Sequence, residues 1–395
     1  MGRRLESLEQ FGIDVVLERR RGIRATLLRG ILYALSFIYE RLVQLRLYFY
    51  RKRIFRERAL GCLVISIGNL TVGGTGKTPI VEKFARALQA GGRRVAILSR
   101  GYKSLPRKRK WLSRLRGDSD PPRVVSDGKS LLLDSVTAGD EPYMLAHNLK
   151  DVIVLVDKDR VKSGRFAIDK WHVDTLLLDD GFQYLHLKHR LDMVLVDRQA
   201  PFGNEFLLPR GTLRESPGNL RRASYIFITK NTGEPNSALM KRIRRYNRTA
   251  EVIECAHKPL HLQNVFTGEQ LPLEALRETF IGSLCAIAAP ESFEDALRKL
   301  GAHVDLAKSY IDHHYYTEAE LISFIKRCIR RDLAMIVTTE KDSVRMPRLP
   351  EAGLKVPIYF LRVEIEILSG HESWEHCVAR ICKPQPLLSP ERFFA

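Results

Sequence analysis

The sequence predicts an α/β protein with a P-loop NTPase-like, doubly wound, mostly parallel sheet. A second, smaller α/β domain and an N-terminal amphipathic helical segment complete the predicted fold. Three observations support this prediction: apolar β-rich runs alternate with helical stretches, a glycine-rich loop joins one such run to a helix, and an apolar stretch framed by arginines precedes them. At 395 residues the chain is long enough for two domains with separate cores.

The net charge of +19 is concentrated in two segments. Residues 1–60 carry 14 basic and 6 acidic side chains, and residues 100–123 carry 9 basic and 2 acidic ones. This distribution predicts an anionic partner: nucleic acid, a phosphorylated substrate or acidic lipid. The six cysteines show no CxxC pair and no zinc-site spacing, which favours free thiols in a reducing compartment over a disulfide framework.

The N-terminal segment, residues 1–59, favours acidic lipid among these partners. Its longest uncharged run, residues 30–39, is ten residues, about half of what a membrane-spanning helix needs. Arginines flank this apolar stretch on both sides, which is typical of a helix lying in the headgroup region of an anionic membrane. A core helix packed on the next domain is the alternative. The apolar positions with helical spacing are Leu28, Ile31, Leu32, Leu35, Ile38, Tyr39, Leu42, Leu45 and Phe49.

The stretch GNLTVGGTGKTP (68–79) has the setting of a phosphate-binding loop, because it follows the strand-like run CLVISI and precedes a helical stretch that Gly91 is placed to end. Backbone N–H groups of the glycines would face phosphate oxygens, Lys77 would neutralise the terminal phosphates, and Thr78 would hold Mg²⁺. Thr71 replaces the first glycine of the usual template, so the chain must enter the loop by a different bend. The expected ATP-binding residues are Thr71, Val72, Gly73, Gly74, Thr75, Gly76, Lys77 and Thr78.

A second acidic group for the metal is expected at the end of a neighbouring strand. DTLLLDDGFQ (174–183) supplies Asp179 and Asp180 after a short apolar run, with a helix cap or an Asx-turn as the alternative. RVVSDGKSLLL predicts a hairpin that turns at Asp-Gly. Further strands are predicted at 94–98, 152–156, 193–196 and 225–229.

Two classes of P-loop protein compete. Partition-type ATPases, which bind DNA or membrane, carry a lysine immediately before the two glycines. Val72 occupies that position here, which weighs against this class. The other class is a small-molecule kinase that acts at a membrane.

The chain resembles the tetraacyldisaccharide 4'-kinase family of lipid A synthesis. The resemblance rests on long motifs in one order between about 62 and 345: ISIGNLTVGGTGKTP, ILSRGYK, AGDEPYMLA, DKDRVKSG, LLLDDGFQ, NEFLLPRGTLRE, DHHYY and TTEKD. It implies transfer of the ATP γ-phosphate to the 4'-hydroxyl of a tetraacylated glucosamine disaccharide 1-phosphate, with Mg²⁺. It also implies a peripheral protein on the cytoplasmic face of the inner membrane. We expect a monomer that binds ATP, the lipid and an anionic membrane, and no nucleic acid.

The same resemblance implies roles for individual residues. Asp140 would be the base, supported by His313, and Glu141 would help Asp179 and Asp180 to order Mg²⁺. Arg160 and Arg214 would lie near the transferring phosphate or the substrate. Arg100, Tyr102 and Gln183 would have supporting roles. Without the resemblance, Asp140 is interpreted as a helix N-terminal residue and the arginines as surface ion-pair partners. TTEKD either lines the nucleotide base or is a plain strand-end loop.

Three features depart from the family pattern: Tyr184 in place of a histidine, Arg210 in place of an alanine, and the long basic insert 105–122. The expected organisation is an interfacial segment (1–59), a P-loop kinase domain (60–235), a β linker (236–275), a smaller α/β domain (276–365) that delivers His313 across a cleft, and a C-terminal helix and tail (366–395).

Overall fold

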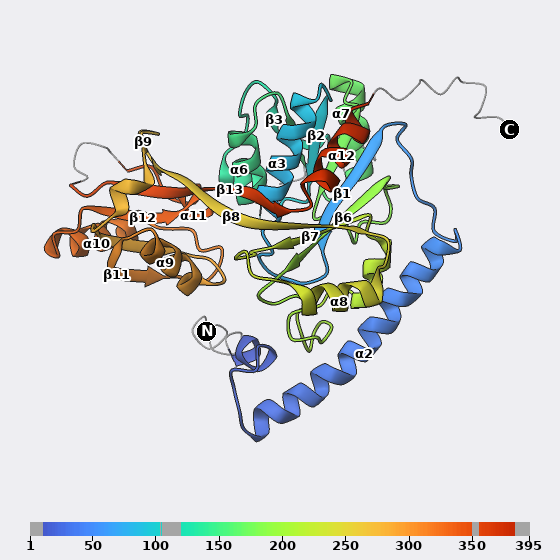
Figure 1. The fold of residues 1–395 in the computed structure, drawn as a ribbon, viewed down its shortest axis with the longest axis horizontal. Helices are drawn as coiled ribbons and strands as arrows, with labels where there is room; N and C mark the ends of the chain where they lie inside the picture. The colour runs from blue at the N-terminus through green and yellow to red at the C-terminus, as the bar shows by residue number, and fades with distance from the viewer. Residues whose placement is uncertain (1–10, 103, 105–119, 350–354, 384–395) are drawn as a thin grey trace.

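The computed structural model describes residues 11–102, 104, 120–349 and 355–383, and its strands form a single sheet (Figure 1). Along this sheet the strands follow the order β11-β10-β12-β13-β8-β7-β6-β1-β5-β2-β4-β3, and β9 pairs with β8. The basic insert is therefore described only from residue 120, and the ends of the chain at 1–10 and 384–395 lie outside the described residues.

The strands are β1 Leu63–Asn69, β2 Val95–Ser99, β3 Arg123–Asp127, β4 Ile153–Val156, β5 Thr175–Asp179, β6 Leu191–Asp197, β7 Tyr225–Thr229, β8 Glu251–Asn264, β9 Gln270–Leu271, β10 Phe280–Cys285, β11 His303–Ser309, β12 Met335–Thr339 and β13 Ile358–Ser369. The helices are α2 Ile23–Arg51, α3 Lys77–Ala90, α5 Ser135–Ala138, α6 Asp140–Asn148, α7 Arg160–Trp171, α8 Ser237–Tyr246, α9 Pro290–Lys299, α10 Glu318–Arg330, α11 Glu340–Ser343 and α12 His371–Cys382, with 3₁₀ turns η1 Pro217–Arg222 and η2 Leu273–Leu276.

The P-loop domain is the part of the sheet from the start of β8 to β3, with the helices that cover it. Its strands from β8 to β4 run parallel, and each strand predicted from an apolar run is present within one or two residues of its expected bounds. Fully buried aliphatic side chains fill these strands because helices cover both faces of a parallel sheet. The doubly wound fold is thus confirmed.

The small domain consists of β10, β11 and β12 with α9, α10 and α11, and it lies to one side of the P-loop domain (Figure 1). The long strands β8 and β13 pair antiparallel over their length and connect the two domains. β8 starts beside β7 in the P-loop domain, and β13 starts beside β12 in the small domain. The two domains are therefore two ends of a continuous sheet.

Two expectations are corrected by the structure. The region 236–275, expected as a β linker, begins with the helix α8, whose Leu239 and Ile243 pack against the core beside β6 and β7. The expected hairpin after β3 turns at Asp127-Gly128 but is short: it forms one bridge, between Ser126 and Leu131, while β3 pairs with β4 along its other edge.

The C-terminal helix α12 returns to the P-loop domain after β13. Its Trp374 ring meets Phe84 of α3 edge-on, with ring centroids 5.5 Å apart, and Phe227 of β7 at 6.3 Å. Cys377 and Ile381 of the same helix are buried in the same core. The P-loop helix α3 is therefore packed between its own sheet and α12.

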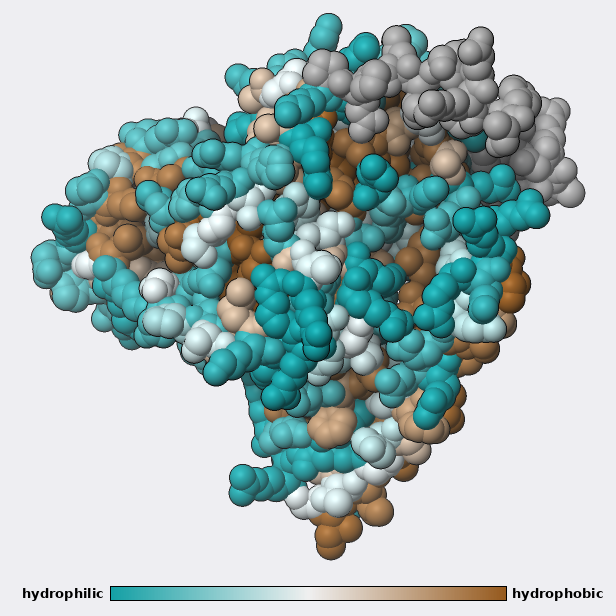
Figure 2. All heavy atoms as spheres, turned by 45° about the vertical axis from the view of Figure 1, so that its right-hand side comes forward, coloured by the Kyte–Doolittle hydropathy of each residue, from teal (hydrophilic) through white to brown (hydrophobic). Residues whose placement is uncertain are grey.

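Helix α2 has two apolar faces, so the predicted stripe divides between them. Leu28, Leu32 and Tyr39 are partly buried against the P-loop domain, whereas Ile31, Ile38 and Leu42 are 60%, 55% and 59% exposed. Hydrophobic side chains accordingly gather along the edge of the molecule that α2 forms (Figures 1 and 2). Among the described helices, none combines the length and the apolar character that crossing a membrane requires.

Candidate functional site

The glycine-rich loop connects β1 to α3 as the sequence predicts, and its entry explains the altered template. Thr71 forms an antiparallel bridge with Leu213, and the Val72 N–H donates to the Thr212 carbonyl at 2.7 Å. The side chain of Asn69 donates to the Thr71 carbonyl at 2.8 Å. The loop is thus held to a second segment before its first glycine, where the usual motif relies on a glycine turn.

The end of the loop is built for an anion. Gly76 has a φ of 77°, a left-handed conformation that glycine adopts without strain, and it is the N-cap of α3. A side chain at Gly76 would also place its Cβ 2.9 Å from Nε2 of His257. The N–H groups and the positive dipole end of α3 face the loop, as at any helix N-terminus. The first turn of α3 carries no acidic residue that would offset this positive end.

Lys77 and Arg214 both contact Asp180. The Lys77 ammonium lies 3.5 Å from Oδ1 of Asp180 and 3.2 Å from the Asn69 side-chain oxygen. Arg214 lies 2.6 Å from Oδ2 of Asp180. Burial acts to raise the pKa of Asp180, but Lys77 and Arg214 outweigh it and lower the pKa. Asp180 therefore stays ionised and holds two cations at the mouth of the loop.

Asp179 has the opposite environment. Burial, followed by the negative charges of Glu141 and Asp180, raises the pKa of Asp179 to about 7. Ser99 donates to its Oδ2 at 3.0 Å, whereas its Oδ1 is buried without a hydrogen-bond partner among the described residues. A free carboxylate oxygen crowded by negative charge fits a hard cation such as Mg²⁺.

Among the described residues, no three acidic, histidine or cysteine side chains converge closely enough to hold a metal by themselves. Mg²⁺ commonly takes one or two carboxylates and completes its shell with water and substrate phosphates. The predicted set of Thr78, Glu141, Asp179 and Asp180 fits a site of that kind, between the carboxyl end of β5 and the starts of α3 and α6.

Arg160 lies at the start of α7, beside the two aspartates. Burial lowers the pKa of Arg160. The charge of Arg100 also lowers it, whereas the charges of Asp179 and Asp180 act to raise it. Its guanidinium stacks on the Tyr184 ring, 4.7 Å from the centroid, and its Nε is buried without a partner among the described residues. Tyr184, which departs from the family pattern, therefore supports the side chain of Arg160.

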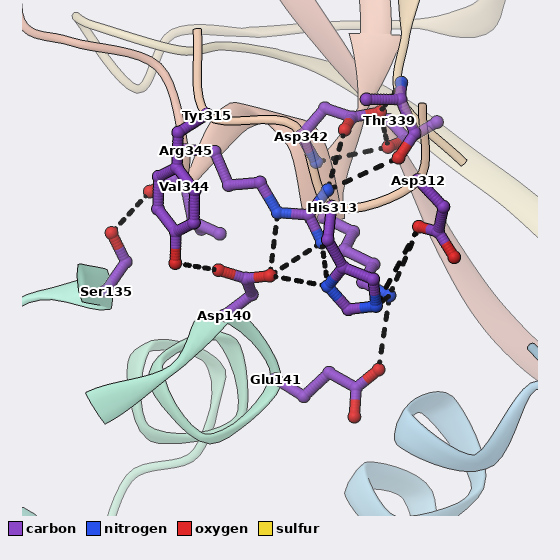
Figure 3. A network of polar contacts seen from close by, with 12 residues as sticks. Ser135, Asp140, Glu141, Asp312, His313, Tyr315, Thr339, Asp342, Val344 and Arg345 are labelled. Atoms are coloured by element: carbon purple, nitrogen blue, oxygen red, sulfur yellow. Dashed lines mark hydrogen bonds and ion pairs between the residues drawn. The ribbon is translucent and has the colours of Figure 1, made fainter. Parts of the chain in front are cut away.

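The predicted pair of Asp140 and His313 is present at the junction of the two domains (Figure 3). Nδ1 of His313 lies 3.1 Å from Oδ2 of Asp140. Arg345 contacts the same oxygen at 2.6 and 2.7 Å, and the Tyr315 hydroxyl donates to Oδ1 at 2.9 Å. Burial acts to raise the pKa of Asp140, but hydrogen bonds from His313 and Arg345 outweigh it and lower the pKa to about 2.

Charged donors face both ring nitrogens of His313. Nε2 lies 3.3 Å from the Lys341 ammonium, and Nδ1 lies 3.1 Å from the guanidinium of Arg345. Nδ1 also lies 3.1 Å from Oδ2 of Asp140, the oxygen that Arg345 contacts. The pair thus combines an ionised carboxylate with an imidazole in direct contact with it.

Three residues of this cluster were missed by the sequence analysis: Tyr315, Lys341 and Arg345. Tyr315 and Lys341 stand inside the quoted motifs DHHYY and TTEKD, which marked them without assigning a role. Arg345 lies just beyond TTEKD, and its side chain is fully buried between Asp140 and Asp342. TTEKD lies at this cluster, where Lys341 also pairs with Glu141 at 3.3 Å.

The remaining predicted residues lie around the same region. The Tyr102 ring is edge-on to His313, with centroids 5.7 Å apart, while Arg100 is exposed. The Gln183 amide donates to the Asn69 carbonyl at 3.0 Å. His314 points away from the cluster, because its ring stacks on Tyr310 with centroids 4.4 Å apart and its Nε2 lies 3.0 Å from Glu320.

The inner face of α2 contacts the loops that carry Arg214 and Gln183. The Tyr39 hydroxyl donates to the Arg214 carbonyl at 3.0 Å, and Arg46 donates to the Gln183 carbonyl at 3.0 Å. Ser36, buried in this face, donates to Leu207 at 2.7 Å. The N-terminal helix is therefore attached directly to the phosphate-binding region.

The chain matches a family model described as Tetraacyldisaccharide-1-P 4'-kinase (LpxK) over residues 28–383. Tetraacyldisaccharide 4'-kinase from Syntrophus aciditrophicus is 37% identical over 370 residues, which are 89% of this chain and 93% of that protein. The enzyme of the same name from Anaeromyxobacter dehalogenans (strain 2CP-1) is 40% identical over 318 residues, 80% of each chain. The crystal structure of LpxK from Aquifex aeolicus in complex with ATP aligns with a TM-score of 0.69 at 28% identity, covering 90% of this chain and 99% of that chain.

The environment of Asp179 predicts a carboxyl group that titrates near neutral pH. Infrared difference spectra of the metal-free protein between pH 5 and 9 should contain a protonated-carboxyl band that disappears with a midpoint near the raised pKa of about 7. Glu141→Gln should move this midpoint to lower pH, because it removes a negative charge that favours the protonated form. Asp179→Asn is the control and should lack the band; a band that persists in this variant would assign the titration to another group.

Proposed function

The chain belongs to the tetraacyldisaccharide-1-P 4'-kinase family, and we propose from this how its site performs the family's reaction. The protein is an ATP-dependent kinase of lipid A synthesis. It transfers the γ-phosphate of ATP to the 4'-hydroxyl of a tetraacylated glucosamine disaccharide 1-phosphate. The observation that supports the mechanism is the contact of Asp140 with His313, next in the chain to Glu141, whose charge acts on the buried Asp179 at the end of β5.

The phosphate chain of ATP would lie over the loop from Thr71 to Thr78, at the N-terminus of α3. Phosphoryl transfer depends mainly on positioning and on neutralising the charge of the transferring group. Lys77 and Arg214, both held by Asp180, and the buried Arg160 supply three fixed cations for this purpose. Arg100, Tyr102 and Gln183 would support the nucleotide or the sugar.

When bound, Mg²⁺ would supply further neutralisation of the phosphate oxygens, held by Thr78, Glu141, Asp179 and Asp180. Asp179 would hold the metal in its ionised form, so metal binding would lower the pKa of this carboxyl from its raised value of about 7. The pairing of Glu141 with Lys341 links this carboxylate group to the small domain.

The Asp140–His313 pair would take the proton of the sugar 4'-hydroxyl. Asp140 would be the base, because the donors around it keep it ionised with a pKa of about 2. His313, whose Nδ1 lies 3.1 Å from Oδ2 of Asp140, would share the proton that the carboxylate receives. After transfer, the carboxylate would stabilise the imidazolium.

The outward face of α2 would bind an anionic membrane, and the proposed location is peripheral, at the cytoplasmic face of the inner membrane. Exposed apolar residues and flanking arginines support this proposal. The same proposal has the enzyme act as a monomer without a nucleic-acid partner.

The kinase assignment predicts a specific product. Purified protein incubated with ATP, Mg²⁺ and a tetraacylated glucosamine disaccharide 1-phosphate should yield a lipid heavier by one phosphate, identified by mass spectrometry. Lys77→Ala should abolish turnover, because the transferring phosphate loses a fixed cation. Near wild-type turnover of Lys77→Ala would remove the P-loop mechanism.

The Asp140–His313 pair predicts non-additive losses. Asp140→Asn and His313→Ala should each lower kcat by about 10²–10⁴-fold, the usual contribution of a positioned acid–base group, with little change in KM for ATP. The double variant should be scarcely slower than the slower single variant, because the two residues act as one unit. His314→Ala is the control, since its ring is stacked on Tyr310. Losses that multiply in the double variant would contradict the pair.

The two faces of α2 predict separable effects on membrane binding. Ile38→Ser and Leu42→Ser should each weaken binding to anionic vesicles by about tenfold, because each removes one large apolar side chain that the membrane would bury. Added salt should weaken it further by screening the arginines. Ser36→Ala, on the inner face, should leave vesicle binding unchanged in co-sedimentation. Equal binding by wild type and both outer-face variants would mean that α2 has a purely structural role.

A further inference from the structure

A second group of charged residues joins the two domains, separate from the reacting site. Glu82 of α3 and Glu340 of α11 share the guanidinium of Arg362 from β13. Arg362 contacts both oxygens of Glu340, at 2.5 and 2.6 Å, and its other nitrogen bonds to Glu82. The side chain of Asn148 donates to Glu340 at 2.6 Å and to Glu82 at 3.2 Å.

These four residues come from both domains and are mostly buried. Glu82 and Asn148 belong to the P-loop domain, Glu340 belongs to the small domain, and Arg362 lies on β13, which connects the two. The side chains of Glu82, Arg362 and Glu340 are 8%, 14% and 15% exposed. At this level of burial each charge depends on its partners for compensation. The positions of these side chains relative to one another are therefore restricted.

The position of this group gives it control over the reacting pair. α6 begins at Asp140 and ends at Asn148, so its two ends are about 12 Å apart at 1.5 Å per residue. The first end contacts His313 and Arg345, and the last end contacts Glu340. Two attachments fix the orientation of α6 against the small domain, which a single ion pair would leave free to rotate.

α11 connects the two groups over three consecutive residues. Glu340 bonds to Arg362 and Asn148, Lys341 contacts His313 and Glu141, and Asp342 accepts from Arg345. On the other side, Glu82 lies on the helix that begins with Lys77, five residues earlier in the sequence. A displacement of α3 would therefore reach, through Glu82 and Arg362, the element that holds Lys341.

We propose that Glu82, Asn148, Glu340 and Arg362 form an interdomain clamp of positioning residues, which couples the phosphate-binding helix α3 to the alignment of Asp140 with His313. The clamp touches neither the expected path of the phosphates nor the reacting pair itself. Its effect on the reaction rests on the proposed function, whereas its effect on the domain junction does not.

Arg86 provides a matched control. It also bonds to Glu82, at 2.8 Å, but it lies on α3 itself and its other contact is the Asn148 carbonyl at 3.1 Å, so it acts within the P-loop domain. Arg362→Gln and Arg86→Gln each remove one guanidinium from the same carboxylate. Only the first variant removes a link between the domains.

The test compares Arg362→Gln, Glu82→Gln/Arg362→Gln and Arg86→Gln in the full-length enzyme. The first two should lower kcat by about 10–100-fold, because a misplacement of about 1 Å can reduce a rate about 10²-fold, with KM for ATP within about threefold of wild type. Arg86→Gln should stay within about twofold in both constants. The double variant leaves no unpaired charge on Glu82, but Glu340 keeps its charge without Arg362. Circular dichroism spectra and melting temperatures of all three variants therefore accompany the kinetics, so that loss of the clamp is separated from loss of folding.

Hydrogen–deuterium exchange gives a readout that does not depend on turnover. A non-hydrolysable ATP analogue should slow exchange in α6 and α11 of the wild type and of Arg86→Gln, but not in the double variant, while exchange in the loop and α3 slows in all three. If the wild type shows this slowing but no kinase activity, the proposed function fails and the clamp remains. A folded double variant with wild-type kcat, or with wild-type slowing in α11, would overturn the clamp.

Discussion

The ion pair of Asp140 with Arg345 is the interaction on which the arrangement of the two domains depends. Both side chains are almost completely buried, at 3% and 0% exposure, so neither charge can rely on water. Asp140 begins a helix of the P-loop domain, and its donors His313, Tyr315 and Arg345 all come from the small domain. Separation of the domains would leave the buried Arg345 and Asp140 without these partners. The contacts that compensate the charge of Asp140 thus determine the position of the His313 imidazole.

The two adjacent aspartates at the end of β5 show how position alone gives one residue type two states. Asp180 is turned outward by a φ of 54° and receives Lys77 and Arg214, so its pKa falls. Asp179 faces the interior and meets Glu141 and Asp180, so its pKa rises. A left-handed residue other than glycine is strained, and strain of this kind is frequent at functional sites. His313 shares the feature, with a φ of 68°.

Helix α2 combines attachment to the protein with exposure of apolar surface. Its inner face donates hydrogen bonds to backbone carbonyls of the loops that contain Gln183 and Arg214. Its outer face leaves large aliphatic side chains exposed along the edge of the molecule (Figure 2). A helix with one bound and one exposed apolar face can bring a lipid surface close to the phosphate-binding region without crossing the bilayer.

Neighbouring residues along the chain specify the elements and the chemistry that depend on local order. The strand–loop–helix around Lys77, the parallel strands and the acidic pair after β5 are encoded by neighbouring residues, through apolar runs, glycines and helix starts. The family motifs also named Asp140 and His313, which lie 173 positions apart in the chain and meet in the structure.

The side chains that compensate these charges are specified by the folded chain and not by local sequence. Arg345, Lys341 and Arg362 are ordinary basic residues in a chain with 65 lysines and arginines, and nothing in their local sequence distinguishes a buried partner from a solvated one. Their partners become neighbours through the pairing of β8 with β13, which joins segments about a hundred residues apart. The same pairing joins the strands of the two expected domains into one sheet. Burial and long-range strand pairing are properties of the whole chain, and for that reason a local pattern does not reveal them.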